Sequence, residues 1–102
     1  MIKVSAFYPF SDSKSFAWDY YLDKHIPMVI TRFGAACLKV EVEKGLAGPV
    51  AGSNPTYLAV ANMYFDSVEA FQAAFGPVAA EILGDIPNYT SIEPQIQISQ
   101  IM

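Results

Sequence analysis

Histidine is the side chain best suited to proton transfer near neutral pH, and this chain of 102 residues contains a single one, His25. It lies in the stretch YYLDKHIPMV, residues 20 to 29, two positions before Pro27. A proline within a helix lacks a backbone N–H, so the carbonyl of Asp23 loses its helical partner close to His25. Two roles are open. His25 is either a general acid or base in a half-apolar cleft, or a boundary residue that caps the free carbonyl or pairs with a carboxylate.

If His25 is catalytic, burial would disfavour its charged form and leave a neutral ring that can accept a proton. Abstraction of a proton next to a carbonyl, followed by isomerisation or cyclisation, needs little more than such a base. Tyr21, one turn before His25, is the first candidate to orient or protonate a substrate oxygen, and Tyr57, Tyr64 and Tyr89 are further candidates.

Other kinds of site are disfavoured by the residue types present. Cys37 has no identified partner base and fits a small buried hydrophobe better than a nucleophile. The glycines within residues 44 to 55 form no phosphate-binding pattern. One histidine and scattered carboxylates form no metal-ligand cluster, and a haem would depend on His25 alone. We therefore expect neither a metal nor another cofactor.

The composition predicts association with another protein chain. Hydrophobic residues make up 53% of the sequence and charged residues 16%, against roughly 25% charged residues in an ordinary soluble domain. A small domain with so little charge leaves apolar surface uncovered, and a second protein chain can cover it.

Membrane and nucleic-acid binding are disfavoured. No apolar run reaches the roughly 18 residues of a membrane span, and the N-terminus shows no signal-peptide pattern. The single cysteine cannot form an internal disulfide, so we expect a cytoplasmic protein. A net charge of −4 leaves no basic patch for phosphates.

Hydrophobic periodicity predicts four strands and two helices in the order βαββαβ. The second helix begins at Asp66 or Ser67, and Gly76-Pro77 is expected to kink it. The third strand is mainly apolar on both faces, which indicates burial on both sides. The strands are expected at residues 2–8, 36–43, 56–65 and 95–101, and the first helix at about 15–33, ending at Gly34.

Two apolar stripes are expected on the helices. At 100° per residue, the first helix buries a central stripe with His25 beside it. The second helix carries its own stripe at the same spacing. The first stripe is Trp18, Leu22, Ile26, Val29 and Phe33, and the second is Phe71, Ala74, Phe75, Val78 and Ile82.

The order βαββαβ predicts one α+β domain over residues 1–102 with a ferredoxin-like fold: a four-stranded antiparallel sheet with both helices on one face. The other face of the sheet is then uncovered. Two such sheets packed face to face would bury it, which predicts a symmetric homodimer.

Five stretches in this order resemble the EthD family of the dimeric α/β-barrel superfamily. They are YYLDKHIPMV, GLAGPVAGSNPTY, YFDSVEAFQAAFGP, AAEILGDIPNYT and PQIQIS, and together they span nearly the whole chain. The resemblance implies a homodimer whose two sheets form a barrel. It also implies a ligand cleft between the helices and the sheet of each subunit. Members of the superfamily include monooxygenases, lactone isomerases, polyketide cyclases and haem enzymes, so the fold does not decide the chemistry.

The helical pattern and the cleft that the resemblance implies together indicate a candidate site. His25 and Tyr21 are the expected catalytic residues. Relatives often carry a histidine after the Gly-Pro of the second helix, and Val78 at that position puts a mechanism with two histidines in doubt. The expected ligand-binding residues are Trp18, Phe75, Val78, Ile82 and Tyr89.

Two functions follow as expectations. The first is a cofactor-independent enzyme that isomerises, cyclises or oxidises a small hydrophobic carbonyl or aromatic compound in a catabolic pathway. The second is a non-catalytic protein that binds or carries such a compound for a degradation pathway. A ligand that emerges chemically unchanged would favour the second.

Overall fold

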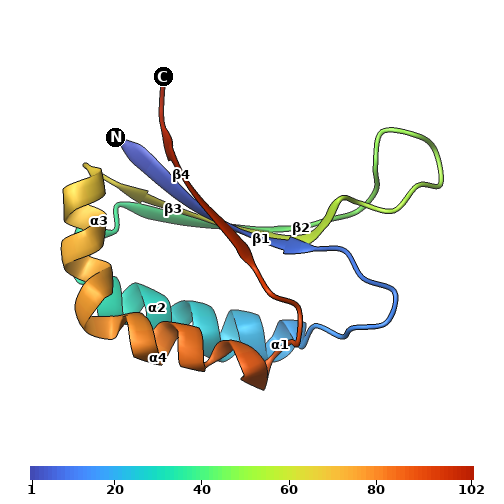
Figure 1. The fold of residues 1–102 in the computed structure, drawn as a ribbon, viewed down its shortest axis with the longest axis horizontal. Helices are drawn as coiled ribbons and strands as arrows, with labels where there is room; N and C mark the ends of the chain where they lie inside the picture. Colours follow the sequence, from blue (N-terminus) through green and yellow to red (C-terminus); the bar gives the residue numbers. More distant parts are fainter.

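The computed structural model describes residues Met1 to Met102 and shows one sheet with helices on one face (Figure 1). The antiparallel sheet has the spatial order β2-β3-β1-β4, and its other face carries no helix. This arrangement confirms the predicted ferredoxin-like α+β fold. The strands are β1 (Ile2–Pro9), β2 (Lys39–Lys44), β3 (Tyr57–Phe65) and β4 (Gln95–Gln100), and the helices are α1 (Trp18–Tyr20), α2 (Ile26–Phe33), α3 (Val68–Phe75) and α4 (Ala79–Gly84).

Strand β1 lies in the middle of the sheet and fixes which side chains face the helices. Val4 lies opposite Met63 of β3 and Ile98 of β4. Successive residues of a strand point to opposite faces, so Val4, Ala6 and Tyr8 share the helix-covered face. All three are buried, with Val4 and Tyr8 nearly inaccessible.

The first helical segment begins at Trp18 and contains a wide turn that the sequence did not predict. Residues Tyr21–His25 form a π-helical turn between α1 and α2, and the N–H of Ile26 donates to the carbonyl of Tyr21. Pro27 lies two positions after His25 and has no N–H to give to the preceding turn, which favours such a local rearrangement.

The π turn changes which residues face the core. The wider turn brings every fourth residue onto the same face, so Tyr21, His25, Val29 and Phe33 are all buried. The stripe predicted at 100° per residue is therefore wrong in its first half. Leu22 is 48% exposed, and His25 lies within the buried stripe and not beside it.

The second helix starts and bends where the sequence indicates. Ser67 is the N-cap, and its hydroxyl accepts the N–H of Ala70 at 3.1 Å, which decides between the two predicted starts. A 3₁₀ turn at Gly76–Val78 separates α3 from α4, so the predicted kink is confirmed.

The loop between β2 and β3 projects from the end of the sheet (Figure 1). Its base is tight because a Cβ at Gly45 would collide with the carbonyl oxygen of Tyr57. Leu46 and Val50 are largely exposed on this loop.

Candidate functional site

An apolar cavity of about 290 Å³ lies between the helices and the sheet. Val4, Ala6 and Tyr8 of β1 form part of its lining. Leu83 and Ile96 also line it although they are 50% and 56% exposed, so the cavity reaches solvent beside the edge strand β4. An engineered apolar cavity of roughly 150 Å³ takes up benzene. The present cavity therefore has room for a compound about twice the size of benzene.

Four of the residues expected at the site line this cavity. Tyr21 and His25 come from the π turn, while Phe75 and Ile82 come from the second helix. The side chains of the cavity wall are otherwise almost all hydrophobic.

The other three expected residues lie outside the lining. Trp18 packs on Phe16 at a ring distance of 4.7 Å. Val78 packs against the core cluster that contains Phe71. Tyr89 lies behind the cavity wall, where its ring is 4.7 Å from the imidazole of His25.

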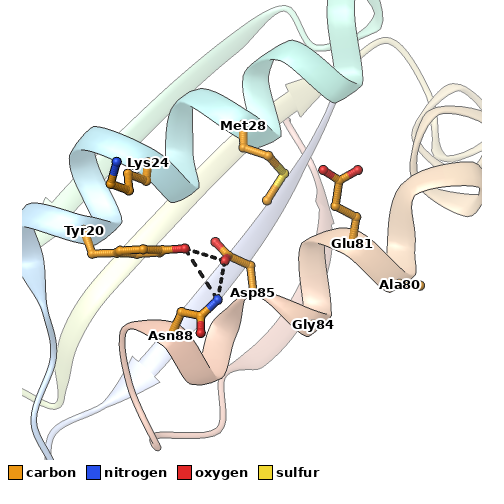
Figure 2. A pocket seen from close by; sticks show the side chains of 8 residues that line it. All are labelled: Tyr20, Lys24, Met28, Ala80, Glu81, Gly84, Asp85 and Asn88. Carbon is orange, nitrogen blue, oxygen red and sulfur yellow. Dashed lines mark hydrogen bonds between the residues drawn. The ribbon is translucent and has the colours of Figure 1, made fainter.

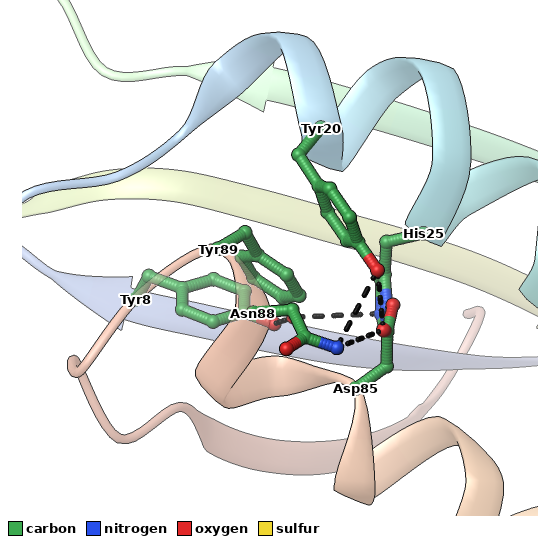
Figure 3. A network of polar contacts seen from close by, with 6 residues as sticks. All are labelled: Tyr8, Tyr20, His25, Asp85, Asn88 and Tyr89. Atoms are coloured by element: carbon green, nitrogen blue, oxygen red, sulfur yellow. Dashed lines mark hydrogen bonds and ion pairs between the residues drawn. The ribbon is translucent and has the colours of Figure 1, made fainter.

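His25 is held by a carboxylate from the other helical segment. Its Nδ1 atom lies 2.8 Å from Oδ2 of Asp85, and only 5% of His25 is exposed. The second oxygen of Asp85 accepts the hydroxyl of Tyr20 at 2.7 Å and the amide of Asn88 at 2.8 Å (Figure 3). The pairing with a carboxylate that was expected for a structural role of His25 is thus present. An imidazole oriented in this way is also compatible with a catalytic role.

The hydrogen bonds keep Asp85 ionised. Burial by itself would raise its pKa, but hydrogen bonds donated by Asn88, Tyr20 and His25 outweigh burial and lower the pKa below its ordinary value. Asp85 is therefore a carboxylate near neutral pH and can only accept hydrogen bonds.

Three buried tyrosines surround the other side of the imidazole. The hydroxyls of Tyr8 and Tyr89 are 2.6 Å apart, and the hydroxyl of Tyr89 is 3.4 Å from Nε2 of His25. The ring of Tyr21 stacks on His25 at 5.5 Å. Burial raises the pKa of all three tyrosines, so their hydroxyls remain protonated.

A second, polar hollow lies on the solvent side of Asp85 (Figure 2). Its volume is about 380 Å³, and its wall includes Tyr20 and Lys24 from the first helical segment and Asp85 and Asn88 from the second. The side chain of Asp85 is 17% exposed there, whereas His25 faces the apolar cavity. The His25–Asp85 pair thus connects an apolar interior to a polar surface.

Sequence reasoning missed Asp85 and Tyr8. The predicted strand included Tyr8, but nothing in the alternation distinguished it from the other core residues. Asp85 and Asn88 are three positions apart in a turn and bond to each other, which is a local signal. The pairing of Asp85 with His25 depends on how the two helical segments pack and has no local signal.

No group of three or more histidine, cysteine, aspartate or glutamate side chains is placed to hold a metal ion. None of the helices is long and apolar enough to cross a membrane.

The βαββαβ order, the sheet topology and the cavity beneath the helices define a ferredoxin-like α+β domain. Residues 12–93 match the EthD domain. The chain is 48% identical to an EthD-like protein from Ralstonia eutropha JMP134, with a TM-score of 0.95 over 99% of this chain and 91% of the other. This chain belongs to the EthD family.

More distant structures share the fold. An ethyl tert-butyl ether D (EthD) family protein from Bacillus halodurans C-125 is 15% identical, with a TM-score of 0.69 over 100% of this chain and 99% of the other. An antibiotic biosynthesis monooxygenase is also 15% identical, with a TM-score of 0.55 over 100% and 99% of the two chains. No curated protein matches the chain.

Proposed function

We propose that this EthD-family chain binds a small, uncharged, hydrophobic compound in the cavity and transfers a proton to or from it through His25. The observation that carries the proposal is the buried imidazole, which lines an apolar cavity and is fixed through Nδ1 by Asp85 at 2.8 Å. An apolar cavity with one or two placed polar groups is the usual form of a small-molecule site.

The proton transfer needs only residues of this chain. The His25 imidazole takes a proton from the carbon next to a carbonyl group of the ligand. The electron pair of the broken C–H bond moves to the carbonyl oxygen and gives an enolate. Asp85 stabilises the imidazolium, and return of the proton to another carbon of a conjugated enolate would complete an isomerisation. In a cyclisation the enolate carbon would instead attack a second carbonyl carbon of the ligand, and the imidazolium would return the proton to the resulting alkoxide oxygen. Tyr21 stacks on the imidazole and restricts its orientation.

A homodimer through the uncovered sheet face is part of the proposal. Phe7 and Tyr57 contact each other at 4.9 Å, and Val60 lies opposite Phe7 on the face without helices. These side chains are only half-buried in the single chain. A second copy of the same face would cover them.

Exchange of ligand protons with heavy water tests the reaction without knowledge of the full substrate. Ligands found by thermal-shift screening of small ketones and aromatic compounds are incubated with the protein in D₂O and examined by mass spectrometry. We expect deuterium at carbon for the true ligand class, and a loss of about 10²–10⁴-fold in rate for His25→Gln. Ligands that bind and are recovered without deuterium would contradict the proton transfer and favour the non-catalytic carrier.

A further inference from the structure

We infer that the cavity selects an elongated carbonyl compound, whose carbonyl group lies beside His25 and whose unbranched apolar tail ends at a wall of aromatic rings. The wall is formed by Phe33, Phe71 and Phe75. This inference rests on the proposed function and names the class of compound that it acts on. It also makes the three phenylalanines specificity-determining residues, because they limit the length of the tail.

The cavity is long because it follows the first helical segment over several turns. Its lining includes both His25 and Phe33, and the eight positions between them correspond to a rise of about 12 Å along an α-helix. On β1, Tyr8 lies at the His25 end and Val4 packs in the core cluster that contains Phe33. Four positions of a strand span about 13 Å, so helix and strand indicate the same length. A ligand that fills this space is elongated.

The polar side chains of the lining lie together at one end. They belong to Tyr8, Tyr21 and His25, and the ring of Tyr21 is 5.9 Å from that of Tyr8 and 5.5 Å from the imidazole. The other lining side chains are aliphatic, methionine, phenylalanine or proline. A carbonyl oxygen gives up its hydrogen bonds to water when it enters an apolar cavity, and only this end offers polar partners in exchange. The carbonyl group therefore belongs beside His25, as the proposed proton transfer requires.

Aromatic rings close the opposite end of the cavity. Phe71 and Phe75 stack at 5.2 Å, and the ring of Phe33 lies 6.3 Å from the first and 6.4 Å from the second. Phe33 and Phe71 are buried in one core cluster, where close packing opposes their displacement. Phe75 packs against this cluster and is half-buried. The three rings thus stop the ligand tail at a fixed distance from His25.

The volume of the cavity sets the size of the ligand. A cavity of roughly 150 Å³ takes up benzene with its six carbon atoms, so one of about 290 Å³ holds about twelve non-hydrogen atoms. 2-Undecanone has this size and carries its carbonyl group near one end of an unbranched chain. In the cavity it would contact both hydrophobic clusters of the core, the one with Phe33 and the one with Tyr21.

The ligand class is tested by calorimetric titration of the whole protein with unbranched 2-alkanones, from 2-pentanone to 2-tridecanone. Each methylene group that enters the cavity should tighten binding about fourfold, so 2-undecanone should bind about 10³-fold more tightly than 2-pentanone. 2-Tridecanone exceeds the cavity and should bind no more tightly than 2-undecanone. Affinities that do not depend on chain length, or that rise as steeply up to 2-tridecanone, would overturn the inference.

The position of the carbonyl group is tested with 6-undecanone, which has the same atoms as 2-undecanone and carries its carbonyl group at the centre of the chain. In the cavity this central carbonyl would lie among apolar side chains, away from His25 and the tyrosine hydroxyls. We expect it to bind at least tenfold more weakly than 2-undecanone. Equal affinities of the two isomers would overturn the placement of the carbonyl group.

Phe75→Ala tests the aromatic wall. Removal of this half-buried ring should lengthen the cavity, so that 2-tridecanone replaces 2-undecanone as the tighter ligand. Met28→Ala is the matched control, because Met28 is half-buried against the same core cluster and does not line the cavity. A Phe75→Ala protein that still prefers 2-undecanone would overturn the assignment of the wall. If Phe75→Ala does not fold, the wild-type series and the pair of isomers remain decisive.

Exchange in heavy water separates this inference from the proposed function. We expect deuterium in 2-undecanone next to its carbonyl group, with a much lower kcat/KM for 2-pentanone. Equal kcat/KM values for the two ketones would support the proton transfer and overturn the elongated ligand. The expected chain-length series without deuterium would support the ligand class and contradict the proton transfer. Failure of every 2-alkanone to bind would overturn the inference and leave the proposed function to the ligands of the thermal-shift screen.

Discussion

Nδ1 of His25 lies 2.8 Å from Oδ2 of Asp85, although the two residues are 60 positions apart in the chain. The contact joins the π turn of the first helical segment to the end of the second (Figure 3). It gives the single histidine a fixed orientation at the end of an apolar cavity. The functional proposals depend on this pair and its neighbours.

His25→Ala and His25→Gln should separate a structural from a catalytic role. The alanine variant leaves Asp85 with Tyr20 and Asn88 as donors and removes a buried ring, so we expect a loss of about 1–3 kcal/mol in unfolding free energy. The glutamine variant can donate to Asp85 through its amide and should retain most of the stability, but it cannot exchange a proton near neutral pH. Chemical denaturation and the heavy-water exchange rate are the two measurements. A His25→Gln protein that exchanges ligand protons at the wild-type rate would refute His25 as the acid or base.

Asp85 should make the protein less stable in acid. Its pKa is lowered in the folded state, so the stabilisation is present above the ordinary aspartate pKa of about 3.9 and is lost as the pH falls through the lower folded value. The difference in melting temperature between wild type and Asp85→Asn should therefore shrink between about pH 5 and pH 2. Asp23→Asn, at an exposed position of the same protein, is the control. A difference that stays constant over this range would show that the ionised form of Asp85 contributes no stability.

The fold was predictable because it depends on local patterns. Alternation marked the strands, and Ser67 and Gly76-Pro77 marked the start and the bend of the second helix. The first helix was predicted less well, because a uniform 100° step places Leu22 in the core. The π turn instead selects Tyr21 and His25.

The site was predictable only in part, because its polar contacts join distant segments. His25 and Tyr21 were singled out by residue type and position, and the structure brings both to the cavity. Asp85 was not singled out from the sequence, because only tertiary packing places its carboxylate beside the imidazole of His25. Val78 was assigned to the cleft from the helical stripe, but the 3₁₀ turn at Gly76–Val78 changes the direction of the chain there, and the side chain packs on the neighbouring core cluster.

Ile82→Trp should block the cavity. Ile82 is 8% exposed and lines the cavity, so an indole ring at this position would occupy space that the ligand needs. We expect at least a tenfold loss of affinity for any cavity ligand, and a change of up to about 1–3 kcal/mol in stability from overpacking. Ile30→Trp on α2 is the matched control, because Ile30 is 46% exposed. Equal affinities of the two variants would place the ligand site elsewhere.

Tyr8→Phe should weaken ligand selection more than the fold. The substitution removes the 2.6 Å contact between the hydroxyls of Tyr8 and Tyr89 and leaves the aromatic ring in place. We expect a cavity ligand that carries an oxygen to lose most of its advantage over the corresponding hydrocarbon, with a stability loss of about 1 kcal/mol. Tyr64→Phe is the control, since Tyr64 donates to Glu41 on the face without helices. A preserved preference in Tyr8→Phe would exclude Tyr8 as the group that meets the ligand oxygen.

Val60→Asp should dissociate the proposed homodimer. Val60 lies on the inner strand β3 and pairs with Phe7 on the sheet face without helices, so a carboxylate there would be buried in the proposed interface. Sedimentation velocity at micromolar concentration should show a dimer for wild type and a monomer for the variant. Leu22→Asp, on an exposed helical position, should remain a dimer. A monomeric wild type would contradict the dimer and leave the cavity proposal to be judged separately.

The most direct test of the central claim is a titration of ¹⁵N-histidine-labelled protein with the tightest cavity ligand from the thermal-shift screen, observed at the ring signals of His25. We expect a saturable change in these signals, with the same dissociation constant as a calorimetric titration gives, and no change in Ile82→Trp. Saturable binding of this ligand by calorimetry that leaves the His25 signals unchanged would contradict the claim that the ligand lies against this histidine.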